Sequence, residues 1–338
     1  MKNKISILII LILAITIGVF TGCTQKPAEV KVVGEEVEGK IEELNEDYGI
    51  TINEDTVSFV DGLGEEITID KNPERVVVLF GSYIDIWVRN GGKLVGMVEY
   101  TSEGAIEGAK GVETVGKLGS ISLEKVISLE PDLVILTSNM SAQADIIPTL
   151  KESGIQVVAA DYEGEDDYHK LVRLFTAIND REDLFETNST KVRKDVQEIV
   201  EKAPKDNPPK VFIMFATAKS LTSRGSETTV GEMLANLNTA NIADNPNNLL
   251  DDKNFSLEKI IEENPDFIFV QTMGSDETKI IERIKADAES NPAWASLSAV
   301  KNDRYIFLPK ELYTYKANHR YAEAYENLAE ILYPEVFK

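Results

Sequence analysis

The stretch Ile121–Leu136, ISLEKVISLEPDLVIL, returns 134 residues later as Phe255–Val270, FSLEKIIEENPDFIFV. Seven of the sixteen aligned positions are identical. Each copy begins with a serine that can cap a helix, Ser122 or Ser256, and continues as a short amphipathic helix. A Pro-Asp turn and an apolar run of strand length follow. The duplication therefore predicts two similar lobes.

A glutamate stands two residues after the cap in both copies, Glu124 in the first and Glu258 in the second. A carboxylate in the first helical turn is favoured by the free backbone amides and the helix dipole, by about 0.3–1 kcal/mol. The same spacing also fits two equivalent acidic points, one on each lobe, that face a common partner. The residues alone leave both interpretations open.

The first residues have the composition of an export signal. Lys2 and Lys4 precede an apolar run, residues 5–19, which is followed by small residues and Cys23. This order is typical of a secretory signal, here residues 1–22. Cys23 is the only cysteine of the chain, so an internal disulfide is excluded. The segment also resembles a bacterial lipoprotein signal, in which the cysteine carries the lipid and becomes the mature N-terminus.

The chain is strongly acidic, with 58 acidic and 35 basic residues and a formal net charge of −23. Such a surface repels nucleic acid and anionic lipid headgroups, so neither is expected as a partner. Residues 23–55 are polar and acidic with little to bury, and we interpret them as the lipidated N-terminus and a tether.

Strand-like and helix-like runs alternate through the rest of the chain, which predicts a mostly parallel sheet covered by helices in each lobe. Residues 181–203 carry a single apolar stripe at helical spacing, and Pro204 ends it. The expected fold class is α/β, with two lobes, residues 56–180 and 204–338. Each is a mostly parallel sheet flanked by helices, and one long helix joins them.

In open α/β sheets, ligands bind beyond the carboxyl ends of the strands. In the predicted sheets this rule selects Tyr83, Tyr100, Ser138 and Asn139 in the first lobe and Met273 in the second.

One loop, residues 313–320 with the sequence YTYKANHR, is rich in groups that contact ligands. Tyrosine offers a flat apolar face with a polar tip, and lysine or arginine supplies charge for an anionic ligand. A solvated loop leading into the final helix is the alternative. The candidate ligand residues of this segment are Tyr313, Tyr315, Lys316, His319 and Arg320.

Enzyme signatures are missing from the sequence. The chain has two histidines and contains no HExxH, GxSxG, Walker or dinucleotide-binding motif. A metallocluster oxidoreductase of similar two-lobed form would need several cysteines as ligands. We therefore expect no catalytic residue, no resident cofactor and no direct metal site. A purely adhesive surface lipoprotein is the other function class left open.

Four parts of the chain together resemble the substrate-binding lipoproteins of ABC importers. They are the opening VDGLGEEITIDKNPERVVVL, the SLEKVISLEPDLVI block, the interlobe helix and the tail NPAWASLSAVKNDRYIFLPKELYTYKANHRYAEAYENLAEILYP. The class in question has two lobes joined by one long helix and receives ferric siderophores, haem or cobalamin. The resemblance implies a monomer, lipid-anchored on the outer face of the cell membrane, that hands its cargo to an ABC permease with its ATPase.

The resemblance also assigns a role to the paired glutamates. In that family one glutamate on each lobe docks into an arginine-bearing pocket of the permease. Glu124 and Glu258 hold the matching positions. The implied role is docking, and it is compatible with their place at a helix start.

The tail is similar to that of members that bind ferric complexes. This implies that Arg320, Lys316 and Tyr315, with Arg224, meet an anionic iron chelate. Two first-lobe tyrosines, Tyr83 and Tyr100, would pack against the chelate from the other side.

Haem is the nearest alternative cargo, with His319, a tyrosine or Met273 as an axial ligand. Cobalamin is the third, because it needs aromatic walls more than cations. Trp87 is expected close to the first-lobe cleft, where its fluorescence would report binding.

Overall fold

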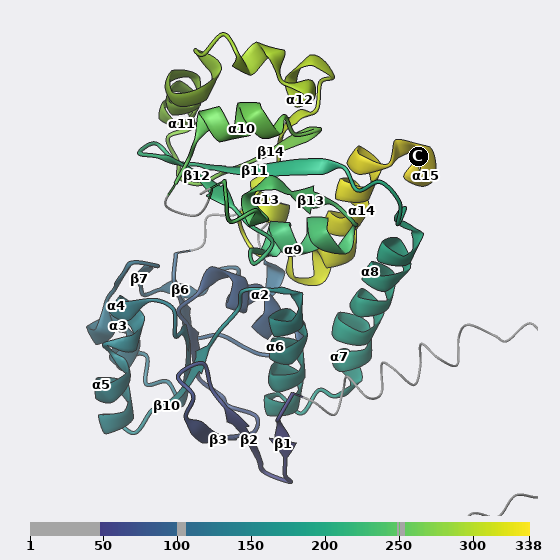
Figure 1. The fold of residues 1–338 in the computed structure, drawn as a ribbon. Coiled ribbons are helices and arrows are strands. Elements are labelled where there is room, and N and C mark those ends of the chain that lie inside the picture. The colour runs from purple at the N-terminus through teal and green to yellow at the C-terminus, as the bar shows by residue number, and fades with distance from the viewer. Residues whose placement is uncertain (1–47, 100–105, 249, 251–253) are drawn as a thin grey trace, which may run out of the picture. The chain divides into compact units, whose positions relative to one another are not determined.

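The computed structural model describes residues 48–99, 106–248, 250 and 254–338 (Figure 1). The predicted signal, Cys23, the tether up to residue 47, and Tyr100 lie outside these residues. Within the described ranges, no helix combines the length and the hydrophobicity that crossing a bilayer requires.

The first sheet is entirely parallel, in the order β10-β9-β4-β5-β6. Its strands are β4 (Val76–Val78), β5 (Gly96–Met97), β6 (Glu113–Thr114), β9 (Leu133–Thr137) and β10 (Gln156–Ala160). The residues of β4 and β9 are buried throughout, as expected for central parallel strands covered on both faces. The surrounding helices are α2 (Gly81–Arg89), α3 (Leu123–Ser128), α4 (Ser141–Ala144), α5 (Ile147–Glu152) and α6 (Glu165–Ile178).

Two smaller β elements accompany this sheet. A hairpin is formed by β2 (Thr56–Val60) and β3 (Glu66–Asp70), and β1 (Thr51–Ile52) adds a third antiparallel strand. A second hairpin is formed by β7 (Gly116–Lys117) and β8 (Ser120–Ile121), ahead of α3.

The second sheet has the order β12-β11-β14-β15, and β13 pairs with β11. Its strands are β11 (Lys210–Ala216), β12 (Leu221–Arg224), β13 (Ala240–Asn241), β14 (Phe267–Thr272) and β15 (Tyr305–Phe307). All pairs are parallel except β11 with β12. The predicted fold class, parallel sheets flanked by helices, is therefore confirmed. The antiparallel strand β12 was not predicted.

Helices cover both faces of the second sheet (Figure 1). Alternate residues of β11 and β14 point to opposite sides, so Ile213 and Phe269 join the larger core while Met214 and Val270 join the smaller one. The helices are α9 (Thr229–Asn236), α10 (Leu257–Glu263), α11 (Glu277–Ile284), α12 (Ser298–Lys301), α13 (Lys310–Tyr313), α14 (Tyr321–Leu332) and α15 (Pro334–Phe337). We refer to the parts built on the two sheets as the first and second lobes.

The duplicated sequence has the same local structure in both lobes. Ser122 and Ser256 cap α3 and α10 by accepting hydrogen bonds from Lys125 N and Lys259 N, at 3.3 and 3.4 Å. Each helix is followed by a residue with left-handed backbone conformation, Glu130 or Asn264. The Pro-Asp turn then leads into β9 or β14.

The aspartate of each Pro-Asp turn accepts hydrogen bonds from the backbone at the start of the neighbouring central strand. Asp132 accepts hydrogen bonds from Glu74 N at 2.7 Å and Arg75 N at 3.0 Å, at the start of β4. Asp266 accepts one from Lys210 N at 2.9 Å, at the start of β11. The register of both central strand pairs is thus set by the repeat.

A basic residue at the start of each of these strands, Arg75 or Lys210, bonds the end of the duplicated helix. Arg75 donates to the Leu129 carbonyl through Nε and Nη2, at 3.0 and 2.6 Å. Lys210 Nζ bonds the Glu263 carboxylate at 2.9 Å. Leu129 and Glu263 are 134 residues apart, so the two bonded residues hold the same position in the two copies of the repeat.

The segment between the lobes, predicted as one regular helix over 181–203, is helical in three pieces. They are α7 (Asp183–Phe185), the π-helical turn η2 (Glu186–Thr190) and α8 (Lys191–Lys202). The structure therefore does not contain a single uninterrupted α-helix in this segment, because a π-helical turn lies between α7 and α8. Of the segment's apolar stripe, Phe185, Val192 and Val196 are buried and Ile199 and Val200 are partly buried, and α8 packs along α14.

The π-helical turn coincides with side-chain bonds to α6. The Tyr168 hydroxyl donates to the Asn188 carbonyl at 2.6 Å, and His169 Nδ1 lies 2.9 Å from Ser189 Oγ. Burial lowers the pKa of His169 more than its hydrogen bond to Glu165 raises it. His169 is thus a structural residue of the core.

The larger core is continuous between the two lobes, running from Val57 to Tyr333. All described residues belong to one compact unit. The lobe boundaries at residues 180 and 204 therefore remain predictions.

We expect the paired aspartate contacts to contribute measurably to stability. Asp132→Ala removes two hydrogen bonds and Asp266→Ala removes one, at a cost of about 1 kcal/mol for each bond in the free energy of unfolding. Urea unfolding at 25 °C measures both values. Asp206→Ala is the control, since this exposed carboxylate has no hydrogen bond to any described residue, and should change stability by less than about 0.5 kcal/mol. Equal effects of all three substitutions would contradict the assigned role.

Candidate functional site

The carboxyl edge of the first sheet is partly closed by the protein itself. Ser138 follows β9, and its hydroxyl is hydrogen-bonded to the carboxylate of Asp161, which follows β10. The hairpin turn lies against this pair, because a Cβ added to Gly62 would come within 2.8 Å of Ser138 Oγ. Asn139 remains exposed, with its amide 3.5 Å from the carboxylate of Glu163. Of the first-lobe candidates that the structure describes, Asn139 is thus the most exposed.

Two aromatic residues of α2 are core residues, in contrast to their predicted place beside a ligand. Tyr83 is fully buried and donates its hydroxyl to the Ala160 carbonyl at 2.9 Å. Burial raises the pKa of this tyrosine far above its ordinary value. Trp87 is also fully buried, packs edge-on against Phe175 and donates to the Lys93 carbonyl at 2.9 Å. Both lie on the face of α2 that packs into the core. The rule that ligands bind beyond the carboxyl ends of strands does not tell which face of a helix a residue occupies.

Tyr313 is a third core tyrosine. Its hydroxyl contacts the Ala324 carbonyl and Asn327 Oδ1, both at 2.9 Å, inside α14. Its carbonyl accepts a hydrogen bond from buried Gln271 at the end of β14, at 2.5 Å. Tyr313 therefore anchors the following loop to the carboxyl end of the second sheet, and its ring is not available to a ligand.

Apolar surface is exposed at the same end of the second sheet. Met273 directly follows β14 and is 47% exposed, and Tyr315 is 44% exposed. The Met273 amide donates to the Ala216 carbonyl at 3.0 Å, which places Met273 beside the carboxyl end of β11. These two predicted residues offer contact surface to a ligand.

Arg224 reaches toward this edge from the unpredicted strand β12. Its backbone pairs with Ile213, and its guanidinium carbon lies 4.3 Å from the ring centre of Phe215, two residues nearer the carboxyl end of β11. Among the residues described, no carboxylate lies within ion-pair distance of it. Arg224 is thus a cation supported by an aromatic ring and open to an anion.

Lys316 connects the two lobes. Its ammonium group donates to the Glu163 carbonyl of the first lobe at 2.7 Å and to Thr229 Oγ1 of the second at 3.1 Å. It also lies 5.0 Å from the ring centre of Tyr162. Burial lowers its pKa, against the raising effect of nearby Glu163 and other carboxylates. The Thr229 hydroxyl itself donates to the Glu163 carbonyl at 2.5 Å.

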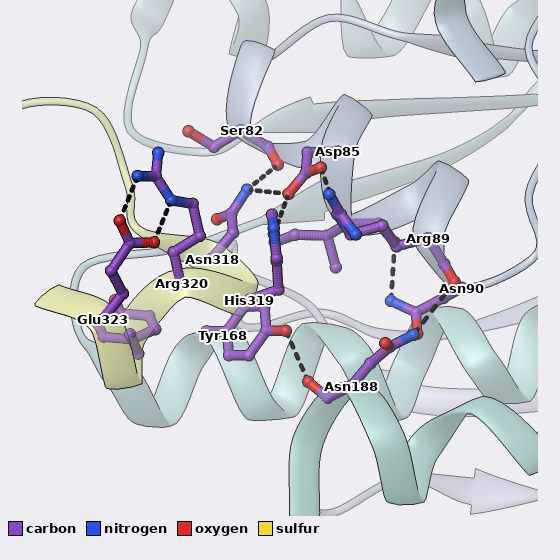
Figure 2. Close-up of polar contacts among 12 residues, drawn as sticks. Ser82, Asp85, Arg89, Asn90, Tyr168, Asn188, Asn318, His319, Arg320 and Glu323 are labelled. Atoms are coloured by element: carbon purple, nitrogen blue, oxygen red, sulfur yellow. Dashed lines mark hydrogen bonds and ion pairs between the residues drawn. The ribbon is translucent and has the colours of Figure 1, made fainter. Parts of the chain in front are cut away.

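A second connection centres on Asp85 of α2, a carboxylate only 7% exposed (Figure 2). Its Oδ1 atom accepts from Arg89 Nε at 2.7 Å. Its Oδ2 atom accepts from Asn318 Nδ2 at 3.0 Å and lies 3.2 Å from His319 Nδ1. Asn318 also donates to the Ser82 carbonyl at 3.0 Å.

The charge state of Asp85 fixes the hydrogen bond to His319. Burial raises the pKa of the Asp85 carboxyl, but the His319 hydrogen bond and the Arg89 charge outweigh burial and hold the pKa below its ordinary value. The ionised carboxylate can only accept, so the proton resides on His319 Nδ1. The Nε2 atom of this partly exposed imidazole is left for another partner.

Arg320, predicted as the main cation for a ligand, is already paired. Its Nε and Nη2 atoms donate to the two carboxylate oxygens of Glu323, at 2.6 and 2.7 Å. The hydrogen bond raises the pKa of the arginine and lowers that of the glutamate. A ligand would have to displace Glu323 or share the guanidinium with it.

Glu124 and Glu258 are both exposed in the first turn of α3 and α10. Neither side chain is hydrogen-bonded or ion-paired to any residue within the described ranges. The repeat thus presents one unpaired carboxylate on each lobe.

Sequence reasoning did not select Asp85 or Glu163 for this region, and it included Asn318 only as part of the loop 313–320. Asp85 carried a signal, because an aspartate stands between Ile84 and Ile86 in an apolar helix and must find partners. Glu163 acts through its backbone carbonyl, which no side-chain pattern can reveal.

Comparisons with known proteins place the chain in a family. The family model described as periplasmic binding protein matches residues 76–312. A Bacillus subtilis protein named uncharacterized ABC transporter substrate-binding lipoprotein YvrC is 31% identical over the full length of both chains. The iron-uptake system-binding protein of the same organism is 24% identical over 89% of each chain.

Solved structures show the same fold at low identity. Staphylococcus aureus IsdE, complexed with heme, is 19% identical with a TM-score of 0.64, covering 77% of this chain and 98% of its own. Staphylococcus aureus SirA, complexed with staphyloferrin B, is 22% identical with a TM-score of 0.62, covering 82% and 97%. The chain belongs to the periplasmic binding protein family, and it is a substrate-binding protein of an ABC transporter rather than an enzyme.

Proposed function

We propose that the protein captures an anionic ferric chelate outside the cell membrane and delivers it to an ABC permease with its ATPase. The names of an iron-uptake relative and of a structural neighbour complexed with staphyloferrin B support this class of cargo. We further propose that the protein is a monomer held to the membrane by a lipid on Cys23, in line with the lipoprotein name of its full-length relative.

The observation that carries the proposal is the open guanidinium of Arg224. In a chain of net charge −23, Arg224 has no carboxylate within ion-pair distance among the described residues, so its charge is available to an anionic ligand. Its guanidinium lies over Phe215, near the carboxyl end of β11, and Met273 and Tyr315 are exposed after β14 and α13. Cation and apolar surface together suit a chelate with anionic donor groups and an organic frame.

The other two cations of the predicted site have intramolecular partners. Lys316 is bonded to Glu163 and Thr229, and Arg320 is paired with Glu323. A chelate that recruited them would exchange these bonds for its own. We therefore assign the first contact to Arg224, with Lys316 and Arg320 as secondary contacts. Ser138 and Asn139 would meet the chelate from the first lobe.

Removing the charge of Arg224 should weaken chelate binding. Losing one charge-assisted hydrogen bond is worth about 1.5–3 kcal/mol, so Arg224→Met should raise the Kd for an anionic ferric siderophore by about 10- to 100-fold. The measurement is quenching of intrinsic fluorescence during titration of protein lacking residues 1–23. Arg304→Met is a matched control, because Arg304 also lies over a phenylalanine, Phe267, at the amino end of β14. Equal affinity of the wild type and Arg224→Met would contradict the assignment.

Haem is a second candidate cargo, and the Asp85–His319 pair favours it. Histidines that bind metals usually donate their other ring N–H to a carboxylate or carbonyl, which fixes the ring and the tautomer. His319 Nδ1 contacts the Asp85 carboxylate, and the ring is partly exposed. Exposed Met273 offers a thioether as a second axial group.

A haem-binding role predicts a Soret band that depends on His319. Purified protein mixed with haemin should show the band, and His319→Ala should shift or abolish it. Substitution of the other histidine, His169→Gln, should leave the band unchanged, because His169 is fully buried. No shifted Soret band in the wild type would remove haem from consideration. Cobalamin, tested in parallel by its own absorption, is the third outcome.

We propose that Glu124 and Glu258 are the contacts with the permease. Both are exposed at the start of equivalent helices, and neither has a partner among the described residues. An unpaired carboxylate on each lobe suits a receptor with a basic pocket on each of two halves.

Charge reversal at both positions should separate transport from binding. Cells carrying Glu124→Lys with Glu258→Lys should lose uptake, while the purified protein keeps its affinity for the cargo. The control pair, Glu152→Lys with Glu282→Lys, changes one exposed helical glutamate on each lobe and should transport normally. Normal uptake by the Glu124/Glu258 double variant would sink the docking role.

A further inference from the structure

Residues 316–319 of the second lobe are held against the first lobe by two polar connections. Lys316 bonds the Glu163 carbonyl that precedes α6. Asn318 and His319 bond the Asp85 carboxylate of α2. The same short segment carries the side chains that our proposed function places beside the cargo.

Asp85 is the most constrained member of this region. A buried carboxylate is unfavourable unless it is paired and hydrogen-bonded. Arg89, on its own helix, supplies one bond, while the other two groups come from the second lobe (Figure 2). Separating α2 from residues 318–319 would leave one oxygen of a buried carboxylate without these partners. The charge of the Asp85 carboxylate therefore favours the contact between α2 and residues 318–319.

Asn318 is also placed by this contact. Its backbone is left-handed, with φ of 53°, and its side chain is 4% exposed. Both of its amide bonds go to the first lobe, to Ser82 O and Asp85 Oδ2. Its Oδ1 atom is buried without a hydrogen-bond partner among the described residues. Asn318 thus depends on α2 for its position.

The other end of α2 is fixed to the segment between the lobes. Asn188 of the π-helical turn donates to the Arg89 carbonyl at 3.1 Å and to Asn90 Oδ1 at 3.0 Å (Figure 2). The Tyr168 hydroxyl holds the carbonyl of the same Asn188. Helix α2 therefore bridges the ligand segment and the connecting segment, and Asp85 is held on a fixed support.

We propose that Asp85 is a positioning residue that latches the ligand segment 315–320 to the first lobe. By holding Asn318 and His319, it sets the direction in which Tyr315, three residues before Asn318, and Arg320, directly after His319, face the cargo. This inference rests on the proposed function for the use of the segment, but the latch itself exists without cargo.

The latch is tested by hydrogen–deuterium exchange of the full-length chain in mild detergent, with no cargo added. In Asp85→Ala the amides of residues 313–321 should exchange at least tenfold faster than in the wild type, while those of α14 beyond residue 325 stay unchanged. Asp85→Asn keeps one acceptor oxygen and should have a smaller effect. Asp183→Asn, which breaks the exposed pair with Arg181, is the control and should change nothing in the segment.

A combined variant distinguishes a latch from a general packing role. If Asp85 acts through Asn318 and His319, adding Asp85→Ala to a variant that already carries Asn318→Ala and His319→Ala should change exchange in the segment by less than twofold. The inference is overturned if Asp85→Ala and Asp85→Asn both leave exchange at the wild-type rate, or if exchange rises equally throughout the chain. It is also overturned if Asp85→Ala speeds exchange in the segment as much when its partners are already substituted as it does in the wild type. Because no cargo is present, failure of the proposed cargo would leave this result standing. Likewise, an experiment that contradicted the latch would not contradict the proposed cargo.

Discussion

The hydrogen bonds that Asp132 and Asp266 accept from the neighbouring strands are the constraint on which both sheets depend. A parallel strand buried on both faces has no side-chain pattern that fixes its register, because every residue is apolar. A carboxylate at the turn before one strand, bonded to the first amides of the next, supplies that register. The same unit occurs twice, so two sheets with the same central pairing follow from one sequence block.

The duplication also explains why a fold element and a functional surface coincide. The helix in each copy must begin at a capping serine, since the strand that follows has to enter the sheet at a fixed place. A glutamate in the first turn is favoured by the helix dipole and costs nothing there. Two equivalent helix starts therefore present the two carboxylates that we propose as the contacts with the permease.

The sequence predicted the fold well because its signals are local. The repeat, the apolar strands and the stripe on residues 185–200 all depend on residues close in the chain. The site was harder, since Tyr83, Tyr313 and Asn139 follow or flank strands in the same way, yet two are buried and one is exposed. Strand β12 was missed because its four residues, LTSR, carry no alternating apolar pattern. The π-helical turn was missed because bonds from distant Tyr168 and His169 accompany it.

An acidic protein that binds an anion must keep a few cations away from its many carboxylates. In this chain with 58 acidic residues, 13 of the 29 lysines and arginines in the described ranges form an ion pair with a carboxylate, as Arg320 does with Glu323. Lys316 escapes this by bonding a carbonyl and a hydroxyl, and Arg224 by lying over Phe215. Both side chains are held in place by neutral partners, although carboxylates near Lys316 still act to raise its pKa. For the anionic cargo that we propose, these neutral partners matter as much as the cations, because neither cation is tied to a carboxylate in an ion pair.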